Sequence, residues 1–201
     1  MKLYSMPSSG NSYKVRLLLS LLGRDAEIID VEDSSPAIAD AKASGRLPFG
    51  KAPVLELDDG RLLPESNAIL NYLGAGTDFT PSDAFGQAQM LSWMFWEQNQ
   101  HEGVVAVRAA LQHYPQRRHL ATPERMAELL ERGHILLQIM EDRLADHDWL
   151  AGDHVSLADI CLYGYSHTAG ERGGFDMSRF PGINQWIQRI AALPGYKGLN
   201  E

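Results

Sequence analysis

The sequence predicts an α/β domain over residues 1–78 with the element order β-α-β-α-β-β-α, followed by an all-α domain over residues 84–201. Three observations lead to this prediction. Short β-prone runs alternate with helical patterns in the first part of the chain. An Asp-Asp-Gly turn separates two apolar runs there. Farther along, apolar residues recur at the helical spacings of three and four.

The first elements follow from short local patterns. Residues 2–5 (KLYS) form a β-prone run. Residues 8–11 (SSGN) then supply turn and N-cap residues before a helix with a wide apolar face, which Gly23 ends. Residues 26–31 (AEIIDV) predict a second strand of buried character, and residues 34–44 predict an Ala-rich second helix.

A β-hairpin and a third helix complete the predicted α/β domain. Apolar runs over residues 51–57 and 61–63 flank residues 58–60 (DDG). Asp-Gly between apolar runs is the strongest short hairpin signal. A helix follows over residues 65–73, and Gly74 ends it. This order implies a small mixed sheet with helices packed on its faces.

The remainder of the chain is predicted to be helical. Residues 74–83 (GAGTDFTPSD) form a linker. Residues 84–112 and 123–146 carry helical apolar spacing, and residues 156–169 and 179–192 predict two further helices. The sequence contains no internal repeat and no low-complexity segment.

Composition excludes several classes of protein. The formal net charge is −8, and neither part of the chain is basic, which argues against nucleic acid or an anionic membrane as the main partner. No apolar run reaches the roughly 18 residues that a membrane span requires. The first residues are too polar for a signal peptide. A single cysteine, Cys161, forms neither an internal disulfide nor a zinc cluster. We therefore expect a cytoplasmic, metal-free protein.

The first candidate motif lies at the start of the first helix. A helix N-terminus exposes unpaired N–H groups and a partial positive charge, so it stabilises an anion placed there. The hydroxyl of Ser9 could donate a hydrogen bond to that anion, and Asn11 could add an amide donor. The alternative is that these residues only cap the helix.

Two further motifs could bind a peptide-like ligand. Proline belongs at a strand start, and a cis Ala52-Pro53 bond would expose the backbone of Val54 for pairing with an extended peptide, although X-Pro bonds are mostly trans. Ser66 could bond a ligand carboxylate while Glu65 pairs with an ammonium, which suits an α-amino-acid end. The alternative for Glu65 and Ser66 is a capped first helical turn.

A fourth motif is interpreted as structural. Ser156 and Asp159 form a Ser-x-x-Asp capping box ahead of an apolar helix, with Val155 just before the cap.

In this order and spacing, the motifs resemble the glutathione transferase superfamily over essentially the whole chain. Ser9-Gly10-Asn11 is similar to the Ser/Thr-x-Asn of the bacterial nu- and theta-like groups. The resemblance implies a thioredoxin-like domain over residues 1–78 that binds glutathione. It also implies that the α-helical domain over residues 84–201 supplies most of the pocket for a second substrate.

The resemblance also implies which residues contact the cysteine of glutathione. It places Ser9 and Asn11 at the thiol, with Ser8 as an alternative hydroxyl. Pro53 becomes a cis-proline, and Val54 becomes the backbone partner of the tripeptide's cysteine.

The two ends of glutathione are assigned in the same way. The resemblance places Lys51 near the glycyl end, with a solvated surface lysine as the alternative. Glu65 and Ser66 hold the γ-glutamyl end. Arg108, Arg117 and Arg118 could attract anionic glutathione, although a solvated helix end explains them equally well.

Activation of glutathione as a thiolate is energetically reasonable without a metal or a general base. A free thiol has a pKa of about 8.5, and lowering it to roughly 6.5 needs about 2.7 kcal/mol. A helix terminus contributes about 0.3–2 kcal/mol, and a hydrogen bond to the charged form contributes about 1.5–3 kcal/mol. The thiolate then attacks an electrophilic carbon or a disulfide sulfur.

The leading hypothesis is a transferase that conjugates glutathione, as co-substrate and with no other cofactor, to small apolar electrophiles. The alternatives are a glutathione-dependent disulfide reductase and a non-catalytic binding or regulatory protein. The resemblance suggests a homodimer. Large side chains around Trp93 to Trp96 are assigned to the core, to a subunit contact or to a substrate pocket.

Overall fold

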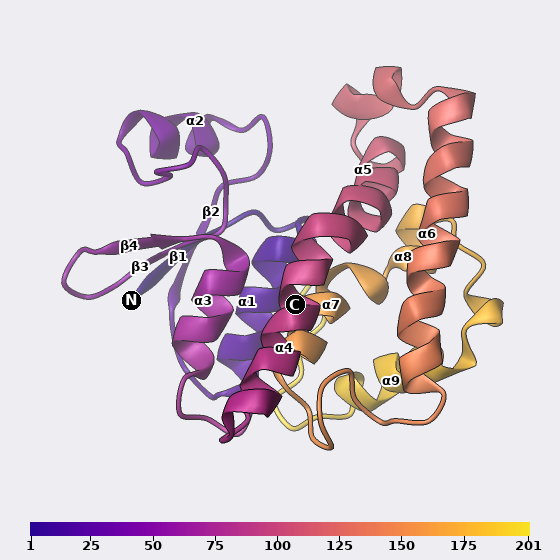
Figure 1. Ribbon diagram of the computed structural model, residues 1–201. Coiled ribbons are helices and arrows are strands. Elements are labelled where there is room, and N and C mark those ends of the chain that lie inside the picture. The colour runs from indigo at the N-terminus through magenta and orange to yellow at the C-terminus, as the bar shows by residue number, and fades with distance from the viewer. The chain divides into compact units, whose positions relative to one another are not determined.

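The computed structural model describes residues 1–201, which form two compact units (Figure 1). The first unit comprises Met1–Thr77 together with Ala191–Glu201, and the second comprises Asp78–Ile190. The element order β-α-β-α-β-β-α, followed only by helices, confirms the predicted fold class.

The C-terminal segment differs from the predicted domain assignment. The sequence predicts residues 84–201 as one all-α domain, but residues 191–201 belong to the first unit. The hydroxyl of Tyr13 donates to the carbonyl of Lys197 at 2.8 Å, and two further side chains of the first helix donate to carbonyls of the same segment. These hydrogen bonds hold the segment on the first unit. Because they join residues far apart in the chain, the spacing of apolar residues in the sequence does not predict them.

The sheet of the first unit has the strand order β2-β1-β3-β4. Its strands are β1 (Lys2–Ser5), β2 (Glu27–Asp30), β3 (Val54–Glu56) and β4 (Leu62–Pro64). β1 and β2 are parallel, whereas β3 is antiparallel to both β1 and β4. The predicted hairpin is therefore confirmed. Gly60 has φ of 84° in its turn, a conformation that glycine adopts without strain.

The three helices of the first unit cover both faces of the sheet. They are α1 (Gly10–Leu21), α2 (Pro36–Ala43) and α3 (Ser66–Gly74). α2 packs with Val54 and Tyr4 on one face. Figure 1 shows α1 and α3 together on the opposite side from α2. Because side chains alternate along a strand, Leu3 and Leu55, which are fully buried, point toward α1 and α3.

The predicted buried character of residues 26–31 is wrong for the strand itself. Most of β2 is exposed, and Ile28 retains 42% of its accessible surface. β2 is an edge strand, so a neighbour covers only one of its sides. The buried residue of this segment is Val31, which follows the strand.

The second unit consists of helices. They are α4 (Ala84–Trp96), the π-helix η1 (Glu97–Ala106), α5 (Val107–His113), η2 (Pro115–Leu120), α6 (Pro123–Leu144), α7 (Leu157–Ser166), α8 (Ala169–Gly173), η3 (Met177–Arg179) and α9 (Pro181–Ala191). The sequence predicts helical structure over 84–112, and the structure places a π-helix within it. None of the helices combines the length and hydropathy that crossing a membrane requires.

The predicted capping box at the start of α7 is confirmed. The backbone N–H of Ser156 donates to the carboxylate of Asp159 at 2.9 Å. The same carboxylate accepts from the Leu150 N–H and from Nε1 of Trp186, both at 2.9 Å. Burial raises the pKa of the fully buried Asp159 carboxyl, and the hydrogen bonds from these donors act in the opposite direction.

Folding changes the protonation of His167 in the second unit. Its Nδ1–H donates to the carbonyl of Tyr163 at 2.6 Å, and its ring stacks on Tyr163 with centroids 4.7 Å apart. Burial lowers the pKa of His167 to about 4 from the ordinary value of 6.5. The folded protein therefore holds this imidazole neutral at pH values where the unfolded chain protonates it.

We expect stability to fall on acidification between pH 6.5 and about 4, because only the unfolded chain binds a proton at His167 in that window. The loss amounts to up to about 3 kcal/mol of unfolding free energy, at 1.36 kcal/mol per pKa unit. Urea unfolding across this pH range measures it. His167→Gln removes this contribution, whereas His154→Gln, at an exposed loop position, retains it. Equal pH dependence in both variants would contradict the assignment.

Candidate functional site

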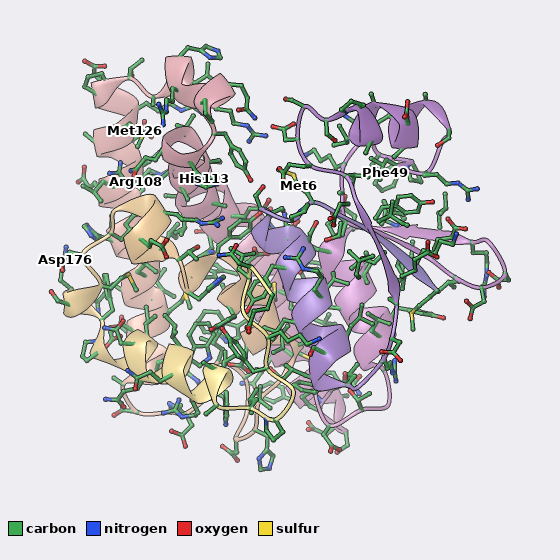
Figure 2. The ribbon with its side chains drawn as sticks, turned by 180° about the vertical axis from the view of Figure 1, so that it is seen from behind. Met6, Phe49, Arg108, His113, Met126 and Asp176 are labelled. Carbon is green, nitrogen blue, oxygen red and sulfur yellow. The ribbon has the colours of Figure 1, made fainter.

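The chain passes from β1 into α1 through a tight turn. The N–H of Ser9 donates to the carbonyl of Met6 at 3.1 Å, which closes a β-turn with Pro7 at its second position. Met6, the first residue of this turn, is labelled in Figure 2. Ser9 is the N-cap residue of α1, but its side chain makes no capping hydrogen bond. Capping therefore does not account for the Ser9 hydroxyl, which stands at the helix N-terminus.

Glu32 holds the neighbouring Ser8. The hydroxyl of Ser8 donates to Oε1 of Glu32 at 2.7 Å, and the backbone N–H of Ser8 donates to Oε2 at 3.1 Å. Glu32 follows β2 and Ser8 follows β1, and the two strands are parallel. The carboxyl ends of parallel strands meet at one edge of a sheet, which explains why these two residues meet.

Asn11 and Ser66 bring the starts of α1 and α3 together. The hydroxyl of Ser66 donates to Oδ1 of Asn11 at 3.2 Å. Ser66 is buried, and Asn11 is half-buried. Two helix N-termini therefore lie side by side, and both direct their N–H groups and partial positive charge toward the same region.

A second hydrogen bond joins the same two helices. Lys14 lies three residues after Asn11, on the same face of α1, and its ammonium donates to Oδ1 of Asn67 at 2.9 Å. The Lys14 side chain is fully buried. The sequence interpretation missed Lys14 and Asn67. Lys14 could have been found from its helical spacing of three residues from Asn11, and Asn67 from its position next to Ser66.

The Ala52-Pro53 peptide bond is cis, as the family resemblance implies. Pro53 is buried, and the next residue, Val54, begins β3. Val54 pairs with Tyr4 on one side and with Pro64 on the other. Its backbone therefore lies at the end of the sheet from which α1 and α3 also start.

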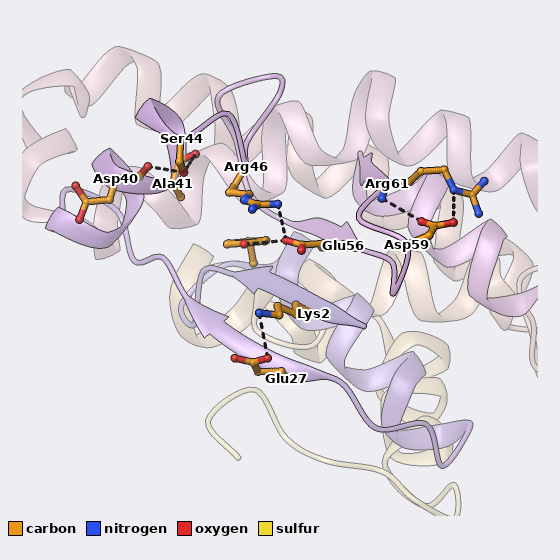
Figure 3. Close-up of polar contacts among 10 residues, drawn as sticks. Lys2, Glu27, Asp40, Ala41, Ser44, Arg46, Glu56, Asp59 and Arg61 are labelled. Carbon is orange, nitrogen blue, oxygen red and sulfur yellow. Dashed lines mark hydrogen bonds and ion pairs between the residues drawn. The ribbon is translucent and has the colours of Figure 1, made fainter.

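An ion pair fixes the segment that precedes Lys51. Nη1 of Arg46 lies 3.1 Å from Oε2 of Glu56, as Figure 3 shows, and the Tyr4 hydroxyl donates to the same oxygen at 3.0 Å. Burial and the Glu56 carboxylate raise the pKa of Tyr4, so it stays protonated as a donor. Lys51 itself is exposed.

Glu65 has a strained backbone at the start of α3. Its φ is 72° and its ψ is 115°, whereas a non-glycine residue rarely adopts positive φ. Such conformations cost about 1–3 kcal/mol and gather at functional sites. The Glu65 side chain is exposed, while the adjacent Ser66 is buried against Asn11.

Together these residues gather hydrogen-bond donors and a positive charge at one end of the sheet. Two helix N-termini supply N–H donors, the Ser9 hydroxyl supplies another, and Lys51 supplies a positive charge. Such an arrangement stabilises negative charge without a metal ion.

Comparison with known proteins agrees with this geometry. Residues 3–78 match the family model described as glutathione S-transferase, N-terminal domain, and residues 104–194 match the one described as glutathione S-transferase, C-terminal domain. The chain belongs to the glutathione S-transferase family.

Relatives of this family member support the assignment over nearly the whole chain. Glutathione S-transferase 3 of Zea mays is 31% identical, over 98% of this chain and 91% of its own length. Disulfide-bond oxidoreductase YfcG of Escherichia coli K12 is 27% identical, over 96% of this chain and 90% of its own. The crystal structure of glutathione S-transferase from Pseudomonas fluorescens Pf-5 is 41% identical, with a TM-score of 0.93, and the match covers 100% and 98% of the two chains.

The structure gives Arg108 of this family member a structural role. Figure 2 labels Arg108 and Met126, and the guanidinium of Arg108 donates to the carbonyl of Met126. Its Nε also donates to the carbonyl of Gly173 at 2.6 Å. Burial lowers the pKa of Arg108. These contacts join helices of the second unit, so attraction of glutathione is not needed to explain this residue.

We expect Lys14→Met to destabilise the protein by about 1–3 kcal/mol of unfolding free energy, because the Asn67 carbonyl loses a buried donor while side-chain length is kept. Urea denaturation measures the loss. Lys42→Met, at an exposed position of α2, serves as the control and should leave stability nearly unchanged. A Lys14→Met protein as stable as this control would show that the hydrogen bond contributes nothing.

Proposed function

We propose that the protein is a glutathione transferase of the Ser-x-Asn type that binds glutathione as the thiolate and conjugates it to small apolar electrophiles. Family membership supports a glutathione-related activity. The observation that carries the proposal is the Ser9 hydroxyl, which occupies the N-cap of α1 without capping it. A hydroxyl in this position has its proton available for an anionic sulfur.

In this proposal the remaining contacts follow the shape of the tripeptide. Asn11 joins Ser9 at the sulfur, and the backbone of Val54, after the cis-proline Pro53, pairs with the cysteine of glutathione. Lys51 lies near the glycyl carboxylate. Glu65 holds the ammonium of the γ-glutamyl end, and Ser66 holds its carboxylate. The exposed carboxylate of Glu65 supports the first assignment, and the N-terminus of α3 supports the second. These seven residues are the proposed glutathione site.

The reaction is a nucleophilic substitution or addition at carbon. The thiol proton leaves to solvent when glutathione binds, and the thiolate forms a bond to the electrophilic carbon. In a substitution, the leaving group departs with its electron pair. The helix dipole and the Ser9 hydroxyl favour the thiolate before it attacks, so the proposal needs no metal or other cofactor besides the co-substrate glutathione.

We expect Ser9→Ala to raise the thiol pKa of bound glutathione by about 1–2 units, because a hydrogen bond to a charged group contributes about 1.5–3 kcal/mol. Titration of the ultraviolet thiolate absorbance measures this shift. Ser35→Ala removes a serine that caps α2 through its side chain, and it serves as the control with an unchanged thiol pKa. Identical titration curves for wild type and Ser9→Ala would remove Ser9 from the mechanism.

Disulfide reduction is the second candidate activity. The match to a disulfide-bond oxidoreductase over 96% of this chain favours it. The same thiolate would attack one sulfur of a disulfide and form a mixed disulfide with it, while the original S–S bond breaks and the other sulfur leaves as a thiolate. Turnover of a standard aryl halide compared with turnover of a glutathione mixed disulfide separates the two activities. Retention on immobilised glutathione without turnover of either substrate would instead indicate a non-catalytic binding protein.

We also propose that the protein forms a homodimer. Phe85 and Phe95 of α4 expose 72% and 64% of their surface, although large aromatic side chains are usually covered. Met94 is buried in the core, and Trp93 and Trp96 are half-buried and lie edge-to-face at 5.4 Å. The surplus of aromatic surface on α4 supports contact with a second copy.

We expect wild type to sediment at twice the mass of one chain at micromolar concentration. Phe95→Glu should shift the mass toward that of a monomer, because burial of a charge in an interface is unfavourable. Ile139→Glu, at an exposed apolar position of α6, is the control and should keep the dimer mass. A monomeric wild type would contradict the proposal.

A further inference from the structure

We propose that Glu32 is a positioning residue that commits the Ser8 hydroxyl and so leaves Ser9 as the one hydroxyl donor to the glutathione sulfur. This inference rests on the proposed function, because it concerns the same sulfur site. It resolves the choice between two adjacent serines, which the sequence leaves open.

The carboxylate of Glu32 acts as an acceptor for the turn between β1 and α1. Oε1 accepts the Ser8 hydroxyl at 2.7 Å and the N–H of Asp33 at 2.9 Å, while Oε2 accepts the N–H of Ser8 at 3.1 Å. Both oxygens are therefore engaged, and two of the three donors belong to Ser8. The Glu32 side chain is half-buried, which strengthens these bonds relative to bonds in water.

The hydroxyl of Ser8 carries a single proton. Because that proton is donated to a carboxylate at 2.7 Å, donation to a thiolate would require breaking a charge-assisted hydrogen bond. A thiolate at Ser8 would also approach the negative charge of Glu32, and like charges repel. Both effects move the sulfur away from Ser8.

Ser9 has the opposite surroundings. Its backbone is fixed by the N–H bond to Met6 and by its carbonyl, which accepts from Tyr13 at 2.9 Å. Its side chain is not used for capping. The Ser9 hydroxyl is thus held in place by its backbone while its proton stays available at the N-terminus of α1.

The turn is held from its other side by Arg16. Nη2 of Arg16 donates to the carbonyl of Pro7 at 3.1 Å, and Nη1 donates to Oγ of Ser5 at 2.7 Å. Burial lowers the pKa of Arg16, and Glu32 is among the carboxylates that act in the opposite direction. Arg16 therefore fixes Pro7 and Glu32 fixes Ser8, so the turn cannot rotate Ser8 toward the sulfur without losing contacts on both sides.

Four variants test this assignment: Ser8→Ala, Ser9→Ala, Glu32→Gln and Glu32→Ala. Asp30→Asn is the matched control, because it removes an exposed carboxylate at the end of β2, two residues before Glu32, and leaves the Ser8 contacts intact. Two quantities are measured for each protein: the thiol pKa of bound glutathione by ultraviolet titration, and the affinity for glutathione by calorimetry.

We expect Ser8→Ala to shift the thiol pKa by less than about half a unit, whereas Ser9→Ala raises it by about 1–2 units. Glu32→Ala releases Ser8 and loosens the turn, so glutathione affinity falls by about tenfold, equivalent to 1.4 kcal/mol. Glu32→Gln keeps a carbonyl acceptor and should remain within about threefold of wild type, which is about 0.7 kcal/mol. If Glu32→Ala fails to fold, Glu32→Gln can still be compared with wild type.

Three outcomes would overturn the inference while the proposed function stands. The first is a thiol pKa raised as much by Ser8→Ala as by Ser9→Ala. The second is a Glu32→Ala protein that binds glutathione as tightly as Asp30→Asn. The third is a lowered thiol pKa in Glu32→Gln, which would mean that the charge acts on the sulfur directly. An unshifted thiol pKa in wild type is a separate result, and it would overturn the proposed function together with this inference.

Discussion

The meeting of two helix N-termini is the constraint on which the site of the first unit depends. The Ser66–Asn11 and Lys14–Asn67 hydrogen bonds hold the starts of α1 and α3 together. Aligned helix N-termini repel each other, and a lysine near an N-terminus adds to this unfavourable field. The packing of α1 and α3 against the sheet must offset this cost. An anion bound between them would relieve it, which is why the proposed function places a thiolate and a carboxylate there.

The surrounding structure keeps the flexible parts of the site in place. Arg16 and Glu32 hold the turn between β1 and α1, and the Arg46–Glu56 ion pair holds the segment before Lys51. The Arg16 and Arg46 contacts each join a loop to a helix or strand of the same unit, whereas the Glu32–Ser8 contact joins two loops. Loops carry the polar groups of a site, while the sheet and helices provide rigidity. The second unit has its own rigid centre in the buried carboxylate of Asp159.

Much of the fold was accessible from local patterns. The Asp-Gly hairpin, the capping box before α7 and the order of strands and helices each depend on neighbours a few residues apart. Patterns failed where a distant contact decided the outcome. The exposure of Ile28 depends on the edge position of β2, and the π-helix η1 lies inside a stretch whose apolar spacing looks continuous.

The sequence by itself determined the element order, the serine and asparagine at the first helix start, and the proline that precedes β3, because these follow from residue chemistry within one turn or strand. Only the tertiary structure decided which polar groups are already engaged. Ser8 and Ser9 are chemically identical in the sequence, and they differ because Glu32 reaches Ser8 across two parallel strands. Contacts between residues far apart in the chain arise from packing, so no local pattern can contain them.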